Sequence, residues 1–438
     1  MRSPSAQPLA RELERAMPER PFAVEFWDGT RMPGTGEGPT FSVRSPAAVA
    51  RVARSLGQLG LGRAYVAGEL DVDDVDAVVQ LVGRWDPPPL KPGARARLAL
   101  AAARAGALRR PPPPPAAELR PRGRLHSRER DALAVRHHYD VSNEFFALFL
   151  DDSMTYSCGV FKLGAATLEE AQEAKLEMVC RKLDLREGQR VLDVGCGWGS
   201  FALHAAERHD VSVLGITLSE PQAALARERV RAAGLEDRVE IQVRDYRDLG
   251  SERFDAISSI GMVEHVGEER IEEYARDLYD VLEPGGRLLN HGITRLTHYD
   301  HREGEFTLRF VFPDGKLIHL DRVVDALERA GFEPEHVEGL REDYAETLRH
   351  WAQRLDERRE EAVRLAGEER VRVWRLYLRA ARNGFEIGYC SVYQVLCTRP
   401  ETKRPPQSPP RTSDGAESPP VGVLAGSRGS ATPHRLRP

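Results

Sequence analysis

A glycine-rich loop that follows a short apolar run constrains most strongly what this 438-residue chain can fold into. The segment reads Val191-Leu-Asp-Val-Gly-Cys-Gly-Trp-Gly-Ser200. The apolar run predicts a strand buried on both faces, and the glycines allow a tight turn and the close approach of a ligand. A helix that follows would present free backbone N–H groups to that ligand. Dinucleotide dehydrogenases and methyltransferases that use S-adenosylmethionine (SAM) share such loops, so the surrounding residues must decide between them.

Short apolar strands alternate with amphipathic helices between residues 126 and 400, a pattern typical of a single α/β domain. The candidate strands are Val191–Val194, Val211–Gly215, Val239–Val243, Phe254–Ser259 and Gly286–Asn290. Right-handed crossovers between them predict a doubly wound, mostly parallel sheet of the SAM-dependent methyltransferase type, with the ligand beyond the carboxyl ends of the strands. Helices are predicted at Leu320–Ala330 and along Tyr344–Asn383, and a final strand at Ser391–Leu396.

The remaining residues divide into four segments. Residues 20–86 predict a small N-terminal mixed α/β domain, with strands at Phe22–Trp27 and Phe41–Arg44 and a helix at Pro46–Leu56. Residues 87–125 contain proline runs on either side of an Ala/Arg-rich helix-like run, which predicts a semi-rigid linker. Residues 1–19 and 401–438 are expected to be disordered.

Composition excludes some functions and leaves others open. The net charge of −5 argues against a general nucleic-acid binder. Basic residues nevertheless dominate from Lys91 to Arg136, so this stretch is either a solvated linker or a docking segment for anionic lipid headgroups, at about 1 kcal/mol per residue. The absence of a long apolar run or a signal-like start favours a cytoplasmic protein with peripheral membrane contact. The five cysteines show no metal-binding spacing, so no metal site is expected. The oligomeric state stays open, a homodimer included.

Four segments occur together with this fold pattern: His138-Tyr-Asp-Val-Ser-Asn-Glu-Phe-Phe146, Met154-Thr-Tyr-Ser-Cys158, the glycine loop, and Gly261-Met-Val-Glu-His-Val-Gly267. The set resembles the cyclopropane fatty acid (cyclopropane-fatty-acyl-phospholipid) synthase family of SAM-dependent methyltransferases, which includes the mycolic acid cyclopropane synthases. The resemblance covers roughly residues 126 to 399. A fainter likeness at Leu59–Glu69 suggests the phospholipid branch of the family.

The resemblance implies a cofactor site for SAM. Many methyltransferases grip the ribose with an acidic residue after the second strand, whereas Ile216-Thr-Leu-Ser-Glu-Pro-Gln222 offers hydroxyls and an amide, as in this family. The implied cofactor-binding residues are Tyr156, Ser157, Gly195, Cys196, Gly197, Thr217, Gln222, Tyr246 and Arg247. For Tyr246 and Arg247, the alternative is an ordinary surface loop after a strand.

The resemblance also implies a reaction. An alkene that attacks the sulfonium methyl group becomes a carbocation, and in the family a bound bicarbonate removes a proton so that the ring closes. The positions that match the bicarbonate site are Cys158, Glu264, His291, the backbone of Ile293, and Tyr344. A shared proton would let the Glu264 carboxylate lie beside an anion. His265 is expected to be structural.

Each of these residues also has a purely structural interpretation. Glu264 would favour the dipole of a following helix, His291 could be a satisfied core histidine at the end of a strand, and Tyr344 could simply pack. Cys158 could be a small buried hydrophobe, since the implied role uses its backbone more than a thiolate. No catalytic role is expected for Cys390 or Cys397, because the cysteine sometimes proposed near the family's C-terminus aligns with Ala381.

We therefore expect methylene transfer from SAM to a cis double bond of a phospholipid acyl chain, giving a cyclopropane fatty acid. Phe312-Pro-Asp-Gly-Lys-Leu-Ile-His319 departs from the family's usual proline- and glycine-rich segment near the acyl pocket. A methylene- or methyl-branched acyl product is therefore the closest alternative. A small-molecule methyltransferase and a non-enzymatic lipid-binding protein are the others.

Overall fold

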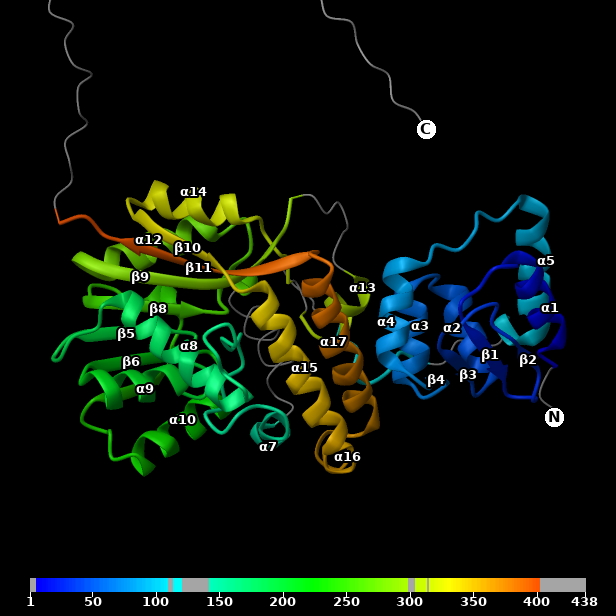
Figure 1. Ribbon diagram of the computed structural model, residues 1–438, viewed down its shortest axis with the longest axis horizontal. Coiled ribbons are helices and arrows are strands. Elements are labelled where there is room, and N and C mark those ends of the chain that lie inside the picture. Colours follow the sequence, from blue (N-terminus) through cyan, green and yellow to red (C-terminus); the bar gives the residue numbers. More distant parts are fainter. Residues whose placement is uncertain (1–4, 109–112, 120–141, 298–303, 313–314, 402–438) are drawn as a thin grey trace, which may run out of the picture. The chain divides into compact units, whose positions relative to one another are not determined.

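The computed structural model describes residues 5–108, 113–119, 142–297, 304–312 and 315–401 (Figure 1). Its larger sheet has seven strands in the order β10-β11-β9-β8-β5-β6-β7. The strands are β5 (Arg190–Val194), β6 (Ser212–Thr217), β7 (Val239–Val243), β8 (Phe254–Ile260), β9 (Leu282–Arg295), β10 (Glu333–Gly339) and β11 (Cys390–Thr398). β5 to β9 pair in parallel, while β11 is antiparallel to both β9 and β10. The predicted doubly wound, mostly parallel sheet is confirmed.

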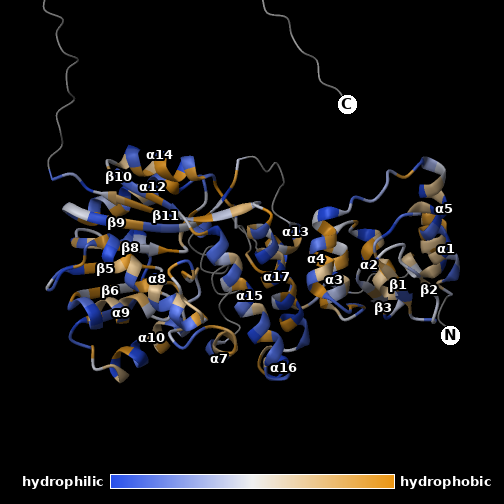
Figure 2. Ribbon diagram, viewed as in Figure 1, coloured by the Kyte–Doolittle hydropathy of each residue, from blue (hydrophilic) through white to orange (hydrophobic). Residues whose placement is uncertain are grey.

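Both faces of this sheet are buried, as the continuous apolar strands predict. On β5, Leu192 and Val194 pack into one core cluster and Val191 packs into the cluster on the opposite face. Helices α12 (Ile271–Val281) and α14 (Leu320–Ala330) complete the first cluster. Helices α8 (Leu168–Leu183), α9 (Ser200–His209) and α10 (Glu220–Ala232) complete the second. Figure 2 shows the hydrophobic residues along the central strands between these layers.

A third core cluster joins α7 (Asn143–Ala147) to the helices that precede the last strand. The predicted charged helical stretch is three helices, α15 (Arg341–Glu357), α16 (Arg359–Ala366) and α17 (Glu368–Glu386). Gly367, at a φ of 78°, separates the last two. The short segments α11 (Val263–Val266), α13 (Glu305–Phe310) and the 3-10 turn η2 (Tyr246–Asp248) complete this part.

The N-terminal part contains a separate sheet of four strands in the order β2-β1-β3-β4. The strands are β1 (Ala23–Phe26), β2 (Arg31–Met32), β3 (Thr40–Val43) and β4 (Leu70–Val72). The helices are α1 (Gln7–Ala16), α2 (Pro46–Arg54), α3 (Gln58–Val66), α4 (Val75–Arg84), α5 (Pro92–Ala102) and the π-helical turn η1 (Ala103–Ala107). The predicted mixed α/β character of this region is confirmed.

Two boundaries predicted for this part are wrong. Residues 7–16 are not disordered, because α1 buries Leu9 and Ala10 in the N-terminal core. Residues 92–107 are not a linker, because α5 packs against α1 and buries Ala101 in the same core, and η1 buries Ala105 there. The remainder of the predicted linker, the proposed domain boundary at residue 126 and the tail from residue 402 lie wholly or partly outside the described residues.

Arginines of α17 bind the N-terminal helices. Arg379 and Arg382 each donate to the carboxylate of Asp76 at 2.8 Å. Arg372 donates to the carbonyl oxygen of Tyr65 at 3.1 Å and lies over its ring. The N-terminal part is therefore attached to α17, the last long helix of the part that contains the seven-stranded sheet.

The structure also differs from the predicted strands at β9 and β10. β9 continues to Arg295, so His291 lies inside a strand and not at its end. β10 was not predicted, because Glu333-Pro-Glu-His-Val-Glu-Gly339 is a mostly exposed edge strand without an apolar run. Within the described residues, no helix is long and apolar enough to span a membrane.

Candidate active site

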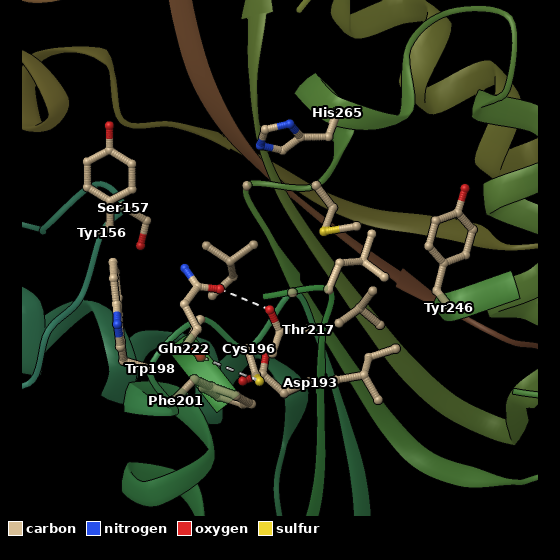
Figure 3. Close-up of a pocket in the computed structure, with 18 of the residues that line it drawn as sticks. Tyr156, Ser157, Asp193, Cys196, Trp198, Phe201, Thr217, Gln222, Tyr246 and His265 are labelled. Atoms are coloured by element: carbon tan, nitrogen blue, oxygen red, sulfur yellow. Dashed lines mark hydrogen bonds between the residues drawn. The ribbon is translucent and has the colours of Figure 1, made fainter. Parts of the chain in front are cut away.

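A pocket opens at the carboxyl ends of β5, β6 and β8, beside the point where the strand order reverses at β5. It is lined by all nine residues predicted to bind the cofactor: Tyr156, Ser157, Gly195, Cys196, Gly197, Thr217, Gln222, Tyr246 and Arg247. Figure 3 shows Tyr156, Ser157 and Trp198 on one side of this space and Tyr246 on the other, with Thr217 and Gln222 between them. The sheet thus places its ligand site where open α/β sheets usually do.

The glycine loop turns sharply as it leaves β5. Gly195 has a φ of 76°, and a Cβ there would lie 2.6 Å from Sδ of Met262, so the position favours glycine. The N–H groups of Gly195 and Cys196 both donate to the carbonyl oxygen of Ile216 at 3.0 Å, which joins the loop to β6. Helix α9 begins at Ser200 and lies directly behind the loop.

Two polar side chains after β6 form a fixed pair in the pocket. Thr217 donates through Oγ1 to Oε1 of Gln222 at 2.9 Å, and both residues are buried (Figure 3). Because the amide oxygen is occupied by Thr217, the Gln222 amide nitrogen is left to donate to a ligand.

The far side of the pocket carries a preorganised arginine. Asp245 accepts hydrogen bonds from Nε of Arg247 at 2.9 Å and from Nη2 at 2.6 Å. Tyr246 packs edge-on against Tyr274 with ring centroids 5.5 Å apart, and burial raises the pKa of its phenol. Tyr246 is therefore a neutral aromatic wall with a hydroxyl group, and not an anion.

Aromatic rings surround the opposite wall. Tyr156 stacks on Trp351 with centroids 5.0 Å apart, and Phe146 contacts Tyr156 at 5.4 Å and Trp198 at 5.0 Å. Nε1 of Trp198 donates to Oδ1 of Asn143 at 2.7 Å, so a hydrogen bond as well as packing fixes the orientation of the ring. Such a wall excludes water and presents π-faces that attract a cation.

Glu264 lies in the first turn of α11 and lines the pocket. Its Oε1 accepts a hydrogen bond of 2.7 Å from the backbone N–H of Ile293, whereas Oε2 is buried without a partner in the described part of the chain. Burial raises the pKa of Glu264 to about 7, although the hydrogen bonds from the backbone of Ile293 and Glu264 lower it. The structure thus joins two of the predicted catalytic positions in one contact.

His291 lies on the neighbouring strand β9 and is buried. Lys182 donates to Oε1 of Gln394 at 2.6 Å, which orients the amide so that Nε2 faces Nδ1 of His291 at 3.2 Å. Nδ1 is then an acceptor and Nε2 carries the proton. Burial, with the charges of Lys175 and Lys182, lowers the pKa of His291 to about 3, so the ring is neutral. Nε2 has no partner among the described residues.

The other two predicted catalytic residues lie in the adjoining core. Sγ of Cys158 donates to the carbonyl oxygen of Gly159 at 3.1 Å, and burial raises the pKa of the thiol. Cys158 is therefore not a reactive thiolate. Tyr344 packs against the same cluster as Ile293, with its ring 4.7 Å from Phe385. Neither residue lines the pocket.

Sequence reasoning missed a pair of buried charges beside the cofactor residues. Lys175 on α8 and Asp193 on β5 both line the pocket and are almost fully buried. Burial raises the pKa of Asp193 and lowers that of Lys175, so both shift toward their neutral forms. Lys175 shares the buried face of α8 with Ala171, Gln172 and Val179, and this helical spacing is the signal that could have revealed it.

His265 and Phe312 form another part of the pocket border. His265 lines the pocket, and burial lowers its pKa to about 4. Its ring lies 5.8 Å from that of Phe312, and Gly315 also lines the pocket. The segment predicted to depart from the family pattern therefore borders the site, although residues 313 and 314 lie outside the described part.

Comparison with known proteins gives one consistent result. Residues 126–395 match the family described as mycolic acid cyclopropane synthetase. A probable fatty acid methyltransferase of Pseudomonas putida is 38% identical over 389 residues, which cover 87% of this chain and 92% of that protein. The tuberculostearic acid methyltransferase UfaA1 of Mycobacterium tuberculosis is 33% identical over 410 residues, covering 90% of this chain and 92% of its own length. These alignments are longer than the family match, so they extend into the N-terminal part.

A solved structure supports the same relationship. The mycolic acid cyclopropane synthase CmaA1, complexed with SAH and CTAB, has a TM-score of 0.58 and 34% identity. The match covers 61% of this chain and 98% of that one. The catalytic part therefore has a counterpart in a solved structure that holds SAH, the product left when SAM gives up its methyl group.

Proposed function

Because the chain belongs to the mycolic acid cyclopropane synthetase family and is a SAM-dependent methyltransferase, we propose that its substrate is the cis double bond of an unsaturated acyl chain in a membrane phospholipid. One carbon passes from SAM to the double bond, and the product is a cyclopropane fatty acid. The observation that carries this proposal is the pocket itself. It combines a complete set of predicted cofactor residues with an aromatic wall and with Glu264, whose Oε2 is buried without a partner among the described residues.

The residues present fit SAM. When bound, SAM supplies an electrophilic methyl group on a sulfonium centre. The glycine loop allows close approach of the backbone, Gln222 offers an amide donor, and Arg247 and Tyr246 close the opposite side. These are the groups that a ligand with hydroxyls, an aromatic base and an amino acid portion requires.

The aromatic wall suits an acyl chain that becomes a carbocation. Tyr156 and Trp198 line the pocket, and the surrounding rings exclude the water that would trap the cation as an alcohol. Their π-faces stabilise positive charge, by about 0.5–2 kcal/mol for each well-placed ring.

The final proton needs an acceptor that the protein holds in place. We propose a bound bicarbonate, which fits the two buried polar atoms without partners in the described residues, Oε2 of Glu264 and Nε2 of His291. A neutral Glu264 donates a proton from Oε2 toward an anion, and neutral His291 donates from Nε2. Both groups thus favour an anion without placing a second full negative charge beside it.

A branched product is the second candidate, and a specific observation favours it. Two relatives that align over most of this chain are named a fatty acid methyltransferase and a tuberculostearic acid methyltransferase. In addition, the pocket border at Phe312 and Gly315 belongs to the segment that departs from the usual family pattern. The same cation, losing a different proton, would give a methyl or methylene branch.

The experiment that tests the proposal is incubation of the full-length protein with vesicles of an unsaturated phospholipid and SAM carrying a trideuterated methyl group. Cyclopropane and methylene products both retain two deuterons, but only the methylene product takes up hydrogen under mild reduction. A methyl-branched product that loses its proton from the chain retains three deuterons. Free unsaturated fatty acid replaces the phospholipid in a parallel reaction, and unchanged lipid in both reactions contradicts the proposal.

We also propose that basic residues hold the protein at the membrane surface where such a substrate lies. Lys91, Arg95 and Arg104 are exposed, whereas Arg97 is engaged by Glu12 at 2.9 Å. The basic residues from Arg120 to Arg136 lie outside the described part. Co-sedimentation with vesicles should rise with the fraction of anionic lipid and fall with salt. Binding that ignores lipid charge contradicts this part of the proposal.

A further inference from the structure

We propose that Glu177, Cys180, His204 and His209 form a zinc site between α8 and α9, separate from the cofactor pocket. Donor atoms of Cys180, His204 and His209 all lie within 4.8 Å of one another. Oε2 of Glu177 lies 3.4 Å from Nε2 of His204 and 3.1 Å from Nε2 of His209. None of the four residues lines the cofactor pocket.

The two packed helices bring these side chains together. Glu177 and Cys180 are three residues apart on α8 and so share one face of that helix. His204 lies on α9, and His209 is the last residue of that helix, where the chain turns at Asp210. Because α8 packs against α9 (Figure 1), both pairs meet between the two helices.

The donor set matches zinc more closely than other common metals. A thiolate, two imidazoles and a carboxylate are the three ligand types that tetrahedral zinc accepts, whereas calcium and magnesium require oxygen ligands. In a tetrahedral site with bond lengths of about 2.0–2.3 Å, neighbouring donors lie roughly 3.3–3.6 Å apart. The distances from Oε2 of Glu177 to the two histidines already fall close to this range. Side-chain movements of about 1 Å would therefore bring all four donor atoms to bonding distance of one zinc ion.

An ion-pair cluster of Glu177 with the two histidines is the simplest alternative, but it leaves the thiol unexplained. Nε of Arg181 donates to Oε1 of Glu177 at 2.7 Å, which leaves Oε2 to face both histidines. Zinc would displace the Cys180 proton to solvent, and thiolate with carboxylate would then balance its two positive charges.

The site is open to solvent on one side. The side chains of Glu177 and His209 are 31% and 19% exposed. His204 also borders a second cavity, together with Glu173, Leu176 and Arg208. Zinc can therefore enter from the surface, although Cys180 itself is buried.

A metal at this position would join two helices that also reach the cofactor pocket. Lys175 on α8 and Phe201 on α9 line that pocket, and each lies within one helical turn of a proposed ligand on its own helix. The expected role of zinc is therefore structural: it fixes α8 to α9 and stabilises the fold, without taking part in the reaction.

The test uses untagged full-length protein, because a polyhistidine tag would itself bind zinc. After treatment with a chelator, the protein is titrated with zinc chloride in competition with a chromophoric chelator. About one equivalent of zinc should bind, and the thermal midpoint should rise. Cobalt(II) in place of zinc should give a thiolate charge-transfer band, which Cys180→Ser should abolish.

The variants His209→Gln and Cys180→Ser should each weaken zinc affinity by at least about a hundredfold, while retaining affinity for SAM. Matched controls are His336→Gln, which removes another histidine that faces a glutamate, and Cys397→Ala, which removes another buried thiol. If Cys180→Ser does not fold, the partly exposed His209→Gln carries the test. Failure of the wild type to bind zinc, or equally tight binding by His209→Gln, overturns the inference.

Discussion

The backbone N–H of Ile293 donates a 2.7 Å hydrogen bond to Oε1 of Glu264, and the other oxygen of this carboxyl group is buried without a partner in the described residues. One oxygen is thus held by the backbone of β9, and the other is left without a hydrogen bond in a residue that lines the pocket. With its pKa raised to about 7 by burial, the carboxyl group can carry a proton at neutral pH and donate it to an anion. The proposed anion site requires a carboxyl group of this kind.

Replacement of Glu264 by Gln should therefore lower turnover strongly. The amide keeps the shape and the bond to Ile293 but cannot share a proton, so we expect a loss of about 10²–10⁴-fold in product formation, with SAM affinity changed by less than about threefold. Chromatography of the acyl products and calorimetric titration with SAM measure the two quantities.

The matched control is Glu268→Gln. Glu268 lies near Glu264 in sequence, but its side chain is 40% exposed and pairs with Lys316 at 2.7 Å. The substitution Glu268→Gln should leave turnover unchanged. Turnover of Glu264→Gln close to that of the wild type would instead favour methylation of a small molecule, which needs no anion site.

The Glu264 carboxyl group also makes the stability of the fold depend on pH. Its folded pKa of about 7 lies above the model-peptide value of 4.5, so the folded state holds the proton more tightly than the unfolded state. The stability that this proton provides is complete below pH 4.5 and is lost as the pH rises to about 7. Between these limits, the wild type should lose about 3 kcal/mol relative to Glu264→Gln. Thermal midpoints of both proteins across this range measure the difference, and parallel curves would contradict the assigned pKa.

Much of the catalytic fold was predictable because its signals are local. Strands such as β5 and β6 are continuous apolar runs, and the glycine loop after β5 is a contiguous motif. α1 was missed because it lies in a highly charged stretch, although Leu9 and Leu13 show the four-residue spacing of a helix face.

The site was only partly predictable because some of its contacts join distant residues. The family likeness indicated His291, but nothing local to it in the sequence indicates that Gln394 and Lys182 orient its ring. Lys182 and Gln394 are 212 residues apart and meet only through β11 and α8. The proposed zinc ligands could not be predicted from the sequence for the same reason. A metal-binding motif is recognised by its fixed spacing, and these residues come from two separate helices.

The contact between Gln394 and His291 leads to a prediction about proton position. Replacement of Gln394 by Glu keeps the size of the side chain but turns the donor to Nδ1 into an acceptor. The ring would then carry its proton on Nδ1, and Nε2 would lose its donor function or require a second proton. We expect a fall in turnover of at least about tenfold with little change in SAM affinity.

Nitrogen chemical shifts of His291 provide the readout that a purely structural role would not change. They should indicate protonation at Nε2 in the wild type and at Nδ1 in Gln394→Glu. Gln394→Leu separates this effect from loss of the contact to Lys182, because it removes both bonds without adding an acceptor. Identical shifts in wild type and Gln394→Glu would contradict the assigned tautomer.

The hydrogen bond from Thr217 to Gln222 predicts that Thr217 orients the Gln222 side-chain amide in the cofactor site. Thr217→Val preserves the side-chain volume but removes the donor to Oε1 of Gln222, so the amide is free to rotate and its buried oxygen loses a partner. Since an unsatisfied buried acceptor costs about 1–3 kcal/mol, we expect SAM affinity to fall about tenfold. Thr294→Val is the matched control, because Thr294 is equally buried but its hydroxyl has no partner within the described residues. Calorimetric titration with SAM should show the loss in Thr217→Val alone, and an equal loss in both variants would mean that Thr217 does not orient the amide.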